Sequence, residues 1–169
     1  MRNEATYTMK KIMTVFLAIL MIATLVACGN SSKENAKTQL GTSKLFVVLP
    51  EGFAATGDDF DEDQVAYYYK DDDSIDFDVY QWAKGDEYVL EDEAAYFAAE
   101  YGTTASEVSV NGLSAMKYIS VEEYDGYEYT VINYMFDDGE YIVELCFWTI
   151  NTEEELAAVD EIINTITLD

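Results

Sequence analysis

Alternation of apolar and polar side chains dominates the second half of the chain. Successive segments of this kind are separated by the short sequences Asn111-Gly112, Asp125-Gly126 and Asp137-Asp138-Gly139. Asn-Gly and Asp-Gly supply the residues with positive φ that tight hairpins require. The pattern therefore predicts four consecutive antiparallel strands, over residues 107–110, 113–122, 127–136 and 140–150.

Three further strands are predicted nearer the amino end, over residues 44–49, 65–70 and 75–82. The last of these places Phe77 and Val79 on one face and Asp76 and Asp78 on the other. In the segment 140–150, apolar residues occupy both faces and only Glu144 interrupts them. A strand that is buried on both faces needs helices or long loops over both.

Two segments follow the 3.6-residue period of a helix with one apolar side. The first covers residues 90–101, and Gly102 is suited to end it in the left-handed conformation. The second begins at Thr152, where Glu155 completes a capping box. Its apolar stripe should lie across the sheet, so we expect Ile162→Asp to be among the most damaging substitutions. The element order β-β-β-α-β-β-β-β-α indicates the α+β class, with a mainly antiparallel sheet of about six to seven strands and helices packed on it.

Four sequence segments carry a resemblance to a known fold. They are LFVVLPEGF at 45–53, NGLSAMKY at 111–118, YTVINYMFDDGEYIVELCF at 129–147 and VDEIINTI at 159–166. Together they are similar to the PsbP-like fold, an α/β/α sandwich found in a photosystem subunit, a Ran-binding protein and many small bacterial lipoproteins. The resemblance implies a non-enzymatic binding or assembly module. It transfers no catalytic motif, and the His-bearing surfaces of the photosystem subunit have no counterpart in a chain without His.

A short basic and then apolar stretch lies near the start of the chain. Lys10 and Lys11 precede the uncharged residues 12–27, which would form ~24 Å of helix, short for a membrane span of ~30 Å. This arrangement is typical of a secretory signal, and translation can begin at Met1 or at Met9. The sequence Leu25-Val26-Ala27-Cys28 resembles the lipobox of bacterial lipoproteins. The resemblance implies cleavage before Cys28 and attachment of lipid to its thiol.

The polar residues that follow Cys28 have little to bury, which indicates a flexible tether. We therefore predict a signal peptide over 1–27, the lipidated cysteine and tether over 28–43, and a folded α+β domain over 44–169. The lipid would hold this domain at the extracytoplasmic face of the cell membrane. Cys146 is then the one remaining thiol, and its apolar neighbours predict that it is buried.

Charge excludes several classes of function. The chain of 169 residues carries 34 Asp and Glu residues against 9 Lys and Arg residues, with a formal net charge of −25. Such a surface repels nucleic-acid phosphates, so no nucleic-acid partner is expected. The absence of His from the sequence excludes Ser-His-Asp and Cys-His catalysis and His-ligated zinc.

Two acidic segments are candidates for weak Ca²⁺ binding, because Ca²⁺ is held by several oxygen ligands. The candidate ligands are Asp58, Asp59, Asp61, Asp63, Asp71 and Asp73. The spacing of an EF-hand is absent from the sequence, and solubilising surface charge explains the same residues.

Asp76 and Asp78 lie ~7 Å apart on one strand face and could act as paired carboxylates of a hydrolase. Pairs of this kind arise by chance in so acidic a chain, so we expect no enzyme and no cofactor.

Tyrosine is unusually frequent, with 14 residues in the chain. The candidate recognition residues are Tyr67, Tyr69, Tyr124 and Tyr127. Tyrosines on strands often serve cross-strand packing, but they are also enriched at interfaces. An acidic, Tyr-rich face would suit a basic protein or peptide, or a glycan. The sequence thus predicts a lipid-anchored, non-catalytic binding or assembly module of the cell envelope, with a cation-binding module as the alternative.

Overall fold

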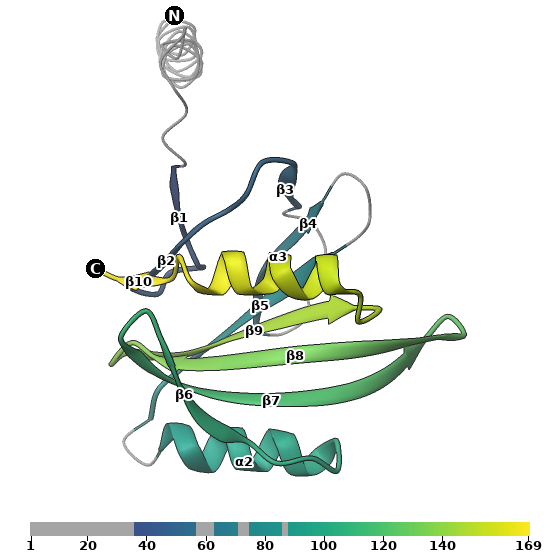
Figure 1. The fold of residues 1–169 in the computed structure, drawn as a ribbon. Helices are drawn as coiled ribbons and strands as arrows, with labels where there is room; N and C mark the ends of the chain where they lie inside the picture. The colour runs from purple at the N-terminus through teal and green to yellow at the C-terminus, as the bar shows by residue number, and fades with distance from the viewer. Residues whose placement is uncertain (1–35, 57–62, 71–74, 86–87) are drawn as a thin grey trace, which may run out of the picture. The chain divides into compact units, whose positions relative to one another are not determined.

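Seven antiparallel strands form the central sheet, in the order β3-β4-β5-β9-β8-β7-β6 (Figure 1). The computed structural model describes residues 36–56, 63–70, 75–85 and 88–169. The strands of this sheet are β3 Phe53–Thr56, β4 Gln64–Lys70, β5 Asp76–Ala83, β6 Ser106–Val110, β7 Leu113–Tyr124, β8 Tyr127–Asp137 and β9 Tyr141–Thr149. The antiparallel sheet and the α+β class predicted from the sequence are confirmed.

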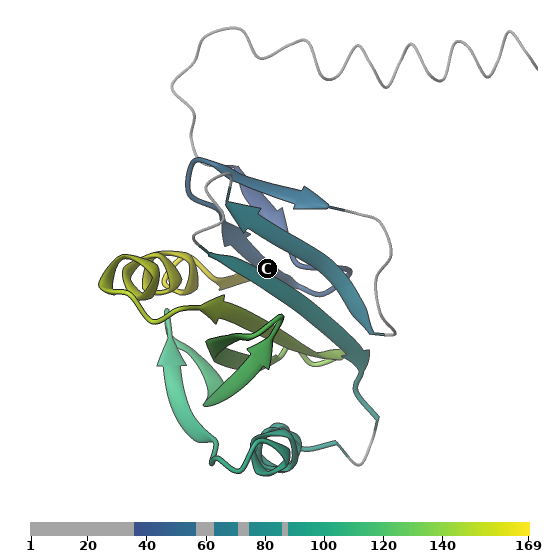
Figure 2. The same cartoon turned by 90° about the vertical axis from the view of Figure 1, so that its right-hand side faces the viewer.

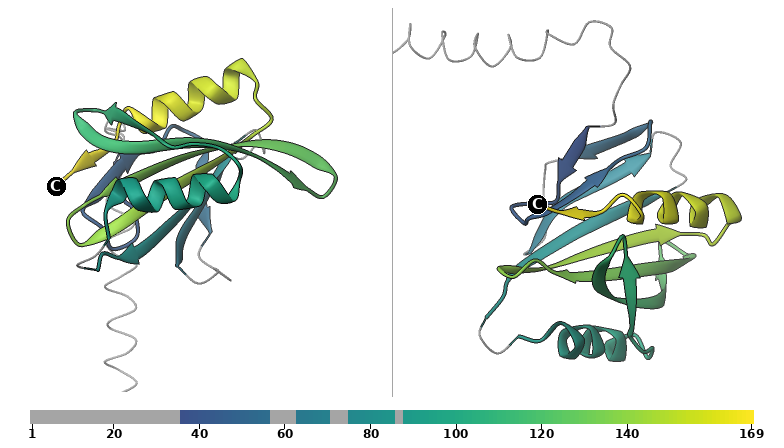
Figure 3. Two further views of the ribbon diagram at one scale, coloured as in Figure 1. Left: turned by 90° about the horizontal axis from the view of Figure 1, so that it is seen from below. Right: turned by 60° about the vertical axis from the view of Figure 1, so that its left-hand side comes forward.

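Two helices cover opposite faces of this sheet, as the views in Figures 1 and 3 show. Helix α2 (Leu90–Glu100) lies against β7 and β8, and α3 (Glu153–Ile163) lies on the other face. The capping box predicted at Thr152 is present, and Gly102 follows α2 with a φ of +68°. The sequence therefore located both helices and the residues that end or begin them.

A second, three-stranded sheet consists of β1 (Lys37–Gln39), β2 (Leu45–Val48) and β10 (Thr167–Leu168), and lies on the α3 side (Figure 2). Strand β1 and the buried Leu40 fall inside the segment predicted to be a tether, so the predicted domain start at residue 44 is wrong. The reason is that β1 is polar and is held by backbone pairing to β2, which leaves no hydrophobic pattern. Strands β3 and β10 were also not predicted, because at four and two residues they are too short to show an alternating pattern.

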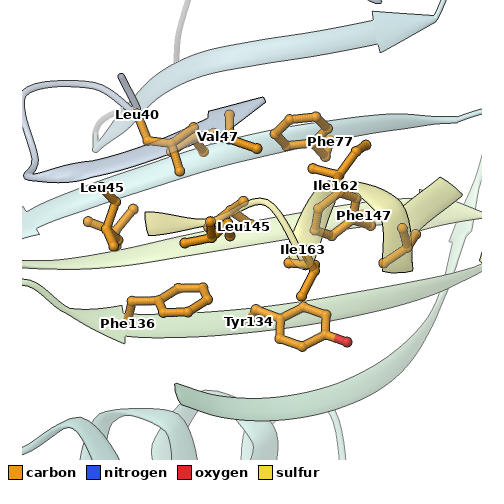
Figure 4. Close-up of a cluster of buried hydrophobic side chains, with 14 of the residues drawn as sticks. Leu40, Leu45, Val47, Phe77, Tyr134, Phe136, Leu145, Phe147, Ile162 and Ile163 are labelled. Carbon is orange, nitrogen blue, oxygen red and sulfur yellow. The ribbon is translucent and has the colours of Figure 1, made fainter. Parts of the chain in front are cut away.

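The main core lies between the large sheet and the layer formed by α3 and the small sheet (Figure 4). The sheet contributes Phe77, Leu145 and Phe147, and α3 contributes Ile162 and Ile163. The rings of Phe77 and Phe147 stack with their centres 4.7 Å apart. Ile162 is completely buried, as the expected effect of Ile162→Asp requires.

A smaller core lies under α2. The buried side chains Ala94 and Ala98 of the helix face Met116, Met135 and Ile142 of the sheet. This packing holds α2 over β7 and β8. The same sheet face continues across β9 and β5 toward β4, where polar and aromatic side chains replace aliphatic ones.

Candidate functional site

A row of polar side chains crosses four adjacent strands on the α2 face of the sheet. The strand register places Tyr118 of β7 opposite Asn133 of β8, Asn133 opposite Cys146 of β9, and Cys146 opposite Asp78 of β5. Directly opposed residues of antiparallel strands project from the same face. All four side chains are buried. Burial is common for cysteine and tyrosine but unusual for the amide of Asn133 and the carboxylate of Asp78.

Glu144 lies two residues before Cys146 on β9, and therefore projects from the same face. Its side chain is only 5% exposed. The Tyr118 hydroxyl donates a hydrogen bond of 2.5 Å to Glu144 Oε1. The pKa of Glu144 is raised from its ordinary 4.5 to about 7. Burial is the main cause of the rise, the hydrogen bond from Tyr118 opposes it, and the nearby Glu122 carboxylate adds to it. A buried carboxyl group that changes charge near neutral pH is the most distinctive group in the described residues.

A cavity of about 570 Å³ opens between this polar row and α2, and we call it the Glu144 cavity. Its wall is rich in aromatic rings and carboxylates. The lining residues are Asp63, Tyr80, Trp82, Tyr88, Glu93, Phe97, Tyr101, Tyr118, Glu122, Val131, Asn133, Glu144, Cys146 and Trp148. The volume lies within the ~300–1,000 Å³ range typical of small-molecule sites.

Cys146 is a buried free thiol, as the sequence predicted. Burial raises the pKa of Cys146 well above its usual value, and the surrounding carboxylates Glu144, Asp78 and Glu122 raise it further. The thiol therefore stays protonated and is a poor nucleophile. Burial likewise raises the pKa of Tyr118, so its hydroxyl remains a hydrogen-bond donor.

A second hollow of about 360 Å³, the aromatic-acidic groove, is lined by Tyr67, Asp76, Asp78, Tyr124, Tyr129 and Trp148. Trp148 lines both hollows, so the groove adjoins the Glu144 cavity. Asp78 accepts hydrogen bonds from Gln64 Nε2 at 2.6 Å and from Trp148 Nε1 at 2.8 Å. These bonds hold the carboxylate and the indole in fixed positions.

The structure brings some of the candidate tyrosines together and separates others. Tyr67 and Tyr124 both line the aromatic-acidic groove, and Tyr67 donates a hydrogen bond of 2.8 Å to Asp76 Oδ2. Tyr69 stacks beside Tyr67, with ring centres 6.0 Å apart. Tyr127 lies opposite Tyr124 at the tip of the β7–β8 hairpin, where both rings are largely exposed.

Most of the candidate metal ligands lie outside the described residues, namely Asp58, Asp59, Asp61, Asp71 and Asp73. Asp63 is described, has a φ of +73° and lines the Glu144 cavity. Within the described ranges no group of three or more Cys, Asp or Glu side chains is placed to hold a metal ion.

The lipobox-like residues Leu25, Val26, Ala27 and Cys28 also lie outside the described ranges. No helix in the described part of the chain combines the length and apolar character of a membrane span.

Sequence reasoning did not select Glu144 as a site residue, although one signal was present. Glu144 is the single charged residue in an otherwise apolar strand that was expected to be buried on both faces. Its partner Tyr118 comes from β7, and its neighbours Asn133 and Trp82 come from β8 and β5. Only the assembled sheet shows that these side chains surround one cavity.

Solved structures with the same architecture include three from bacteria. Cyanobacterial PsbP (CyanoP) from Synechocystis sp. PCC 6803 matches with a TM-score of 0.62 at 9% identity, over 86% of this chain and 99% of CyanoP. LpqN of Mycobacterium tuberculosis, which is involved in cell envelope biogenesis, matches with a TM-score of 0.54 at 12% identity, over 79% of this chain and 89% of LpqN. A Bacteroides thetaiotaomicron protein matches with a TM-score of 0.58 at 14% identity, over 80% of this chain.

The chain spans about half the length of the Bacteroides protein, of which 49% is covered. No protein-family model and no curated protein sequence matches the chain. The structural matches show that the chain has a PsbP-like fold, as the sequence resemblance implied.

Proposed function

We propose that this chain is a non-catalytic binding module of the bacterial cell envelope, held at the membrane by lipid on Cys28, and that it recognises a basic protein segment or cationic peptide. The observation that carries the proposal is the aromatic-acidic groove, in which the rings of Tyr67, Tyr124 and Trp148 lie beside the carboxylates of Asp76 and Asp78. The lipobox-like sequence before Cys28 supports the location. The role of LpqN, which shares the fold, in cell envelope biogenesis is consistent with it.

Two physical effects favour a cationic partner. The net charge of −25 attracts cations and raises their rate of encounter with the surface. Lysine and arginine side chains then gain further from contact with aromatic ring faces, by ~0.5–2 kcal/mol for each contact. The largely exposed Tyr124 offers such a ring face in the groove, which Tyr129 and Trp148 also line.

Titration of the full chain, purified in nonionic detergent, with hexalysine tests the proposal. We expect saturable binding that weakens steeply as salt is added, because screening reduces the charge attraction. Tyr124→Ala should weaken the binding severalfold. Tyr96→Ala is the matched control, because Tyr96 is also exposed but lines neither the groove nor the cavity. Equal binding by both variants, or no binding by the wild-type chain, would refute the proposal.

A further inference from the structure

The charges that line the Glu144 cavity all have the same sign. Four carboxylates face it, those of Asp63, Glu93, Glu122 and Glu144, and no lysine or arginine of the described residues is among its lining. Like charges gathered around a hollow raise its affinity for an ion of the opposite sign. Whatever occupies the cavity should therefore carry positive charge.

Glu144 gives this cavity a charged group that is built into the sheet. Tyr118 satisfies Oε1, whereas Oε2 receives no hydrogen bond from any described residue. Within the described residues, Thr167 Oγ1 is the one buried side-chain nitrogen or oxygen that lacks a hydrogen-bond partner. Glu144 Oε2 is therefore not sealed in the core but is accessible from the cavity that Glu144 lines. A ligand that donates a hydrogen bond and brings a positive charge would satisfy Oε2 and neutralise Glu144 together.

Aromatic rings form most of the remaining wall of the cavity. Trp82 of β5 and Phe97 of α2 are in contact, with ring centres 5.5 Å apart, and Tyr101 stacks over Tyr118 at 6.3 Å. Ring faces attract ammonium groups and also cover the carbon chains attached to them. The lining thus combines a counter-ion with apolar walls, which suits an organic cation that has an alkyl body.

An inorganic cation fits this lining less well. Ca²⁺ requires six to eight oxygen ligands at ~2.3–2.6 Å. The carboxylates around the cavity come from separate elements, and no metal-holding group occurs in the described ranges. The volume of about 570 Å³ is also far larger than one ion needs.

We propose that the Glu144 cavity binds an alkylammonium group, with Glu144 as its counter-ion and Trp82, Phe97 and Tyr101 around its carbon chain. This inference deepens the proposed function, because the cavity adjoins the aromatic-acidic groove through Trp148. The ammonium group can belong to a free amine or to a lysine side chain of the partner.

Binding should be coupled to pH, since only ionised Glu144 attracts the cation. The other titratable groups that line the cavity come from every element around it: Tyr118 and Glu122 of β7, Cys146 of β9, Tyr80 of β5, Glu93 of α2, Tyr88 and Tyr101 on either side of α2, and Asp63 just before β4. Tyr118 and Cys146 stay protonated near neutral pH, because burial raises the pKa of both groups. We therefore expect affinity for an alkylammonium ion to rise as the pH increases through about 7, where Glu144 ionises.

Isothermal titration calorimetry with n-butylammonium tests this inference on the full chain in nonionic detergent. n-Butanol serves as the neutral probe of the same length. Glu144→Gln keeps the shape of the side chain and should reduce n-butylammonium affinity at pH 8 by at least about tenfold, since an ionic hydrogen bond contributes ~1.5–3 kcal/mol. It should also abolish the pH dependence. Glu161→Gln, on the exposed side of α3, is the matched control and should bind like the wild-type chain.

A second titration uses an acetylated, amidated lysine to represent a protein side chain. Binding of n-butylammonium, of the blocked lysine, or of both supports the inference, provided that Glu144→Gln weakens it and that melting curves show the variant to be folded. Binding of n-butanol as tight as that of n-butylammonium would overturn it, as would equal affinity in Glu144→Gln. Hexalysine binding that depends on Tyr124, together with no binding of either small cation, would refute the inference and leave the proposed function intact.

Discussion

Replacement of Glu144 by Gln should stabilise the fold at neutral and higher pH. Gln has nearly the same size, and its side-chain carbonyl oxygen can still accept the hydrogen bond from Tyr118. What the substitution removes is a carboxyl group that is 5% exposed and must ionise inside the protein. The free energy of unfolding should therefore increase wherever the wild-type carboxyl would be charged.

The magnitude follows from the pKa of Glu144 in the folded chain. A carboxyl group with a higher pKa in the folded than in the unfolded chain makes the fold more stable at low pH, and this stability is lost as pH rises. Here the loss should begin near 4.5 and be complete above about 7. At 1.36 kcal/mol for each pKa unit, the difference is about 3 kcal/mol, or on the order of 10 °C in melting temperature for a domain of this size.

Urea unfolding at pH 5 and pH 8, followed by tryptophan fluorescence, measures the effect. Both tryptophans of the chain, Trp82 and Trp148, line the Glu144 cavity. Their fluorescence therefore changes when this part of the structure unfolds. The wild-type chain should lose about 3 kcal/mol more between the two pH values than Glu144→Gln does. Glu161→Gln should lose as much unfolding free energy between the two pH values as the wild-type chain. This control shows that removing an exposed carboxylate does not by itself change the pH dependence. If the free energy of unfolding fell by the same amount between pH 5 and pH 8 in the wild-type chain and in Glu144→Gln, the raised pKa of Glu144 would be refuted.

Three further substitutions test other parts of the account. Ile162→Asp places a charge in the main core and should abolish cooperative unfolding, while Ile150→Asp, at an exposed site, should leave the melting curve nearly unchanged. Thr152→Ala removes the capping box of α3 and should lower the free energy of unfolding by about 1 kcal/mol in urea titrations, and a change near zero would contradict the role of the cap. Cys28→Ala should release the protein from the membrane fraction or leave its precursor unprocessed, whereas Cys146→Ala should do neither; normal cleavage and retention without Cys28 would contradict lipid anchoring.

The turns explain why so much of the sheet could be predicted. Asn111-Gly112 and Asp125-Gly126 adopt the paired positive φ angles that their sequences favour. Short turns also determine which residues lie opposite each other in a hairpin. Strands β7, β8 and β9 are joined by short turns, so the sequence contains enough information to predict that Tyr118, Asn133 and Cys146 lie opposite one another.

The rest of the site depends on contacts that no local pattern encodes. Strand β5 pairs with β9, which lies more than 50 residues further along the chain, and this pairing brings Asp78 and Trp82 to the site. Phe97 of α2 and Tyr101, the residue that follows this helix, line the Glu144 cavity. In the sequence both belong to the apolar stripe of the predicted helix, which indicated only that they pack against the sheet. Likewise, β1 is held by backbone hydrogen bonds to β2, so its polar sequence was taken for part of a tether.

The central claim is that the α2 face of the sheet recognises positively charged partners. Fluorine NMR of the full chain labelled with 5-fluorotryptophan tests it directly, because the chain has two tryptophans and both line this face. Trp82→Phe assigns the two signals. The account predicts that hexalysine shifts the Trp148 signal in a saturable manner and that added salt reverses the shift. Saturable hexalysine binding that leaves both signals unmoved would contradict the claim.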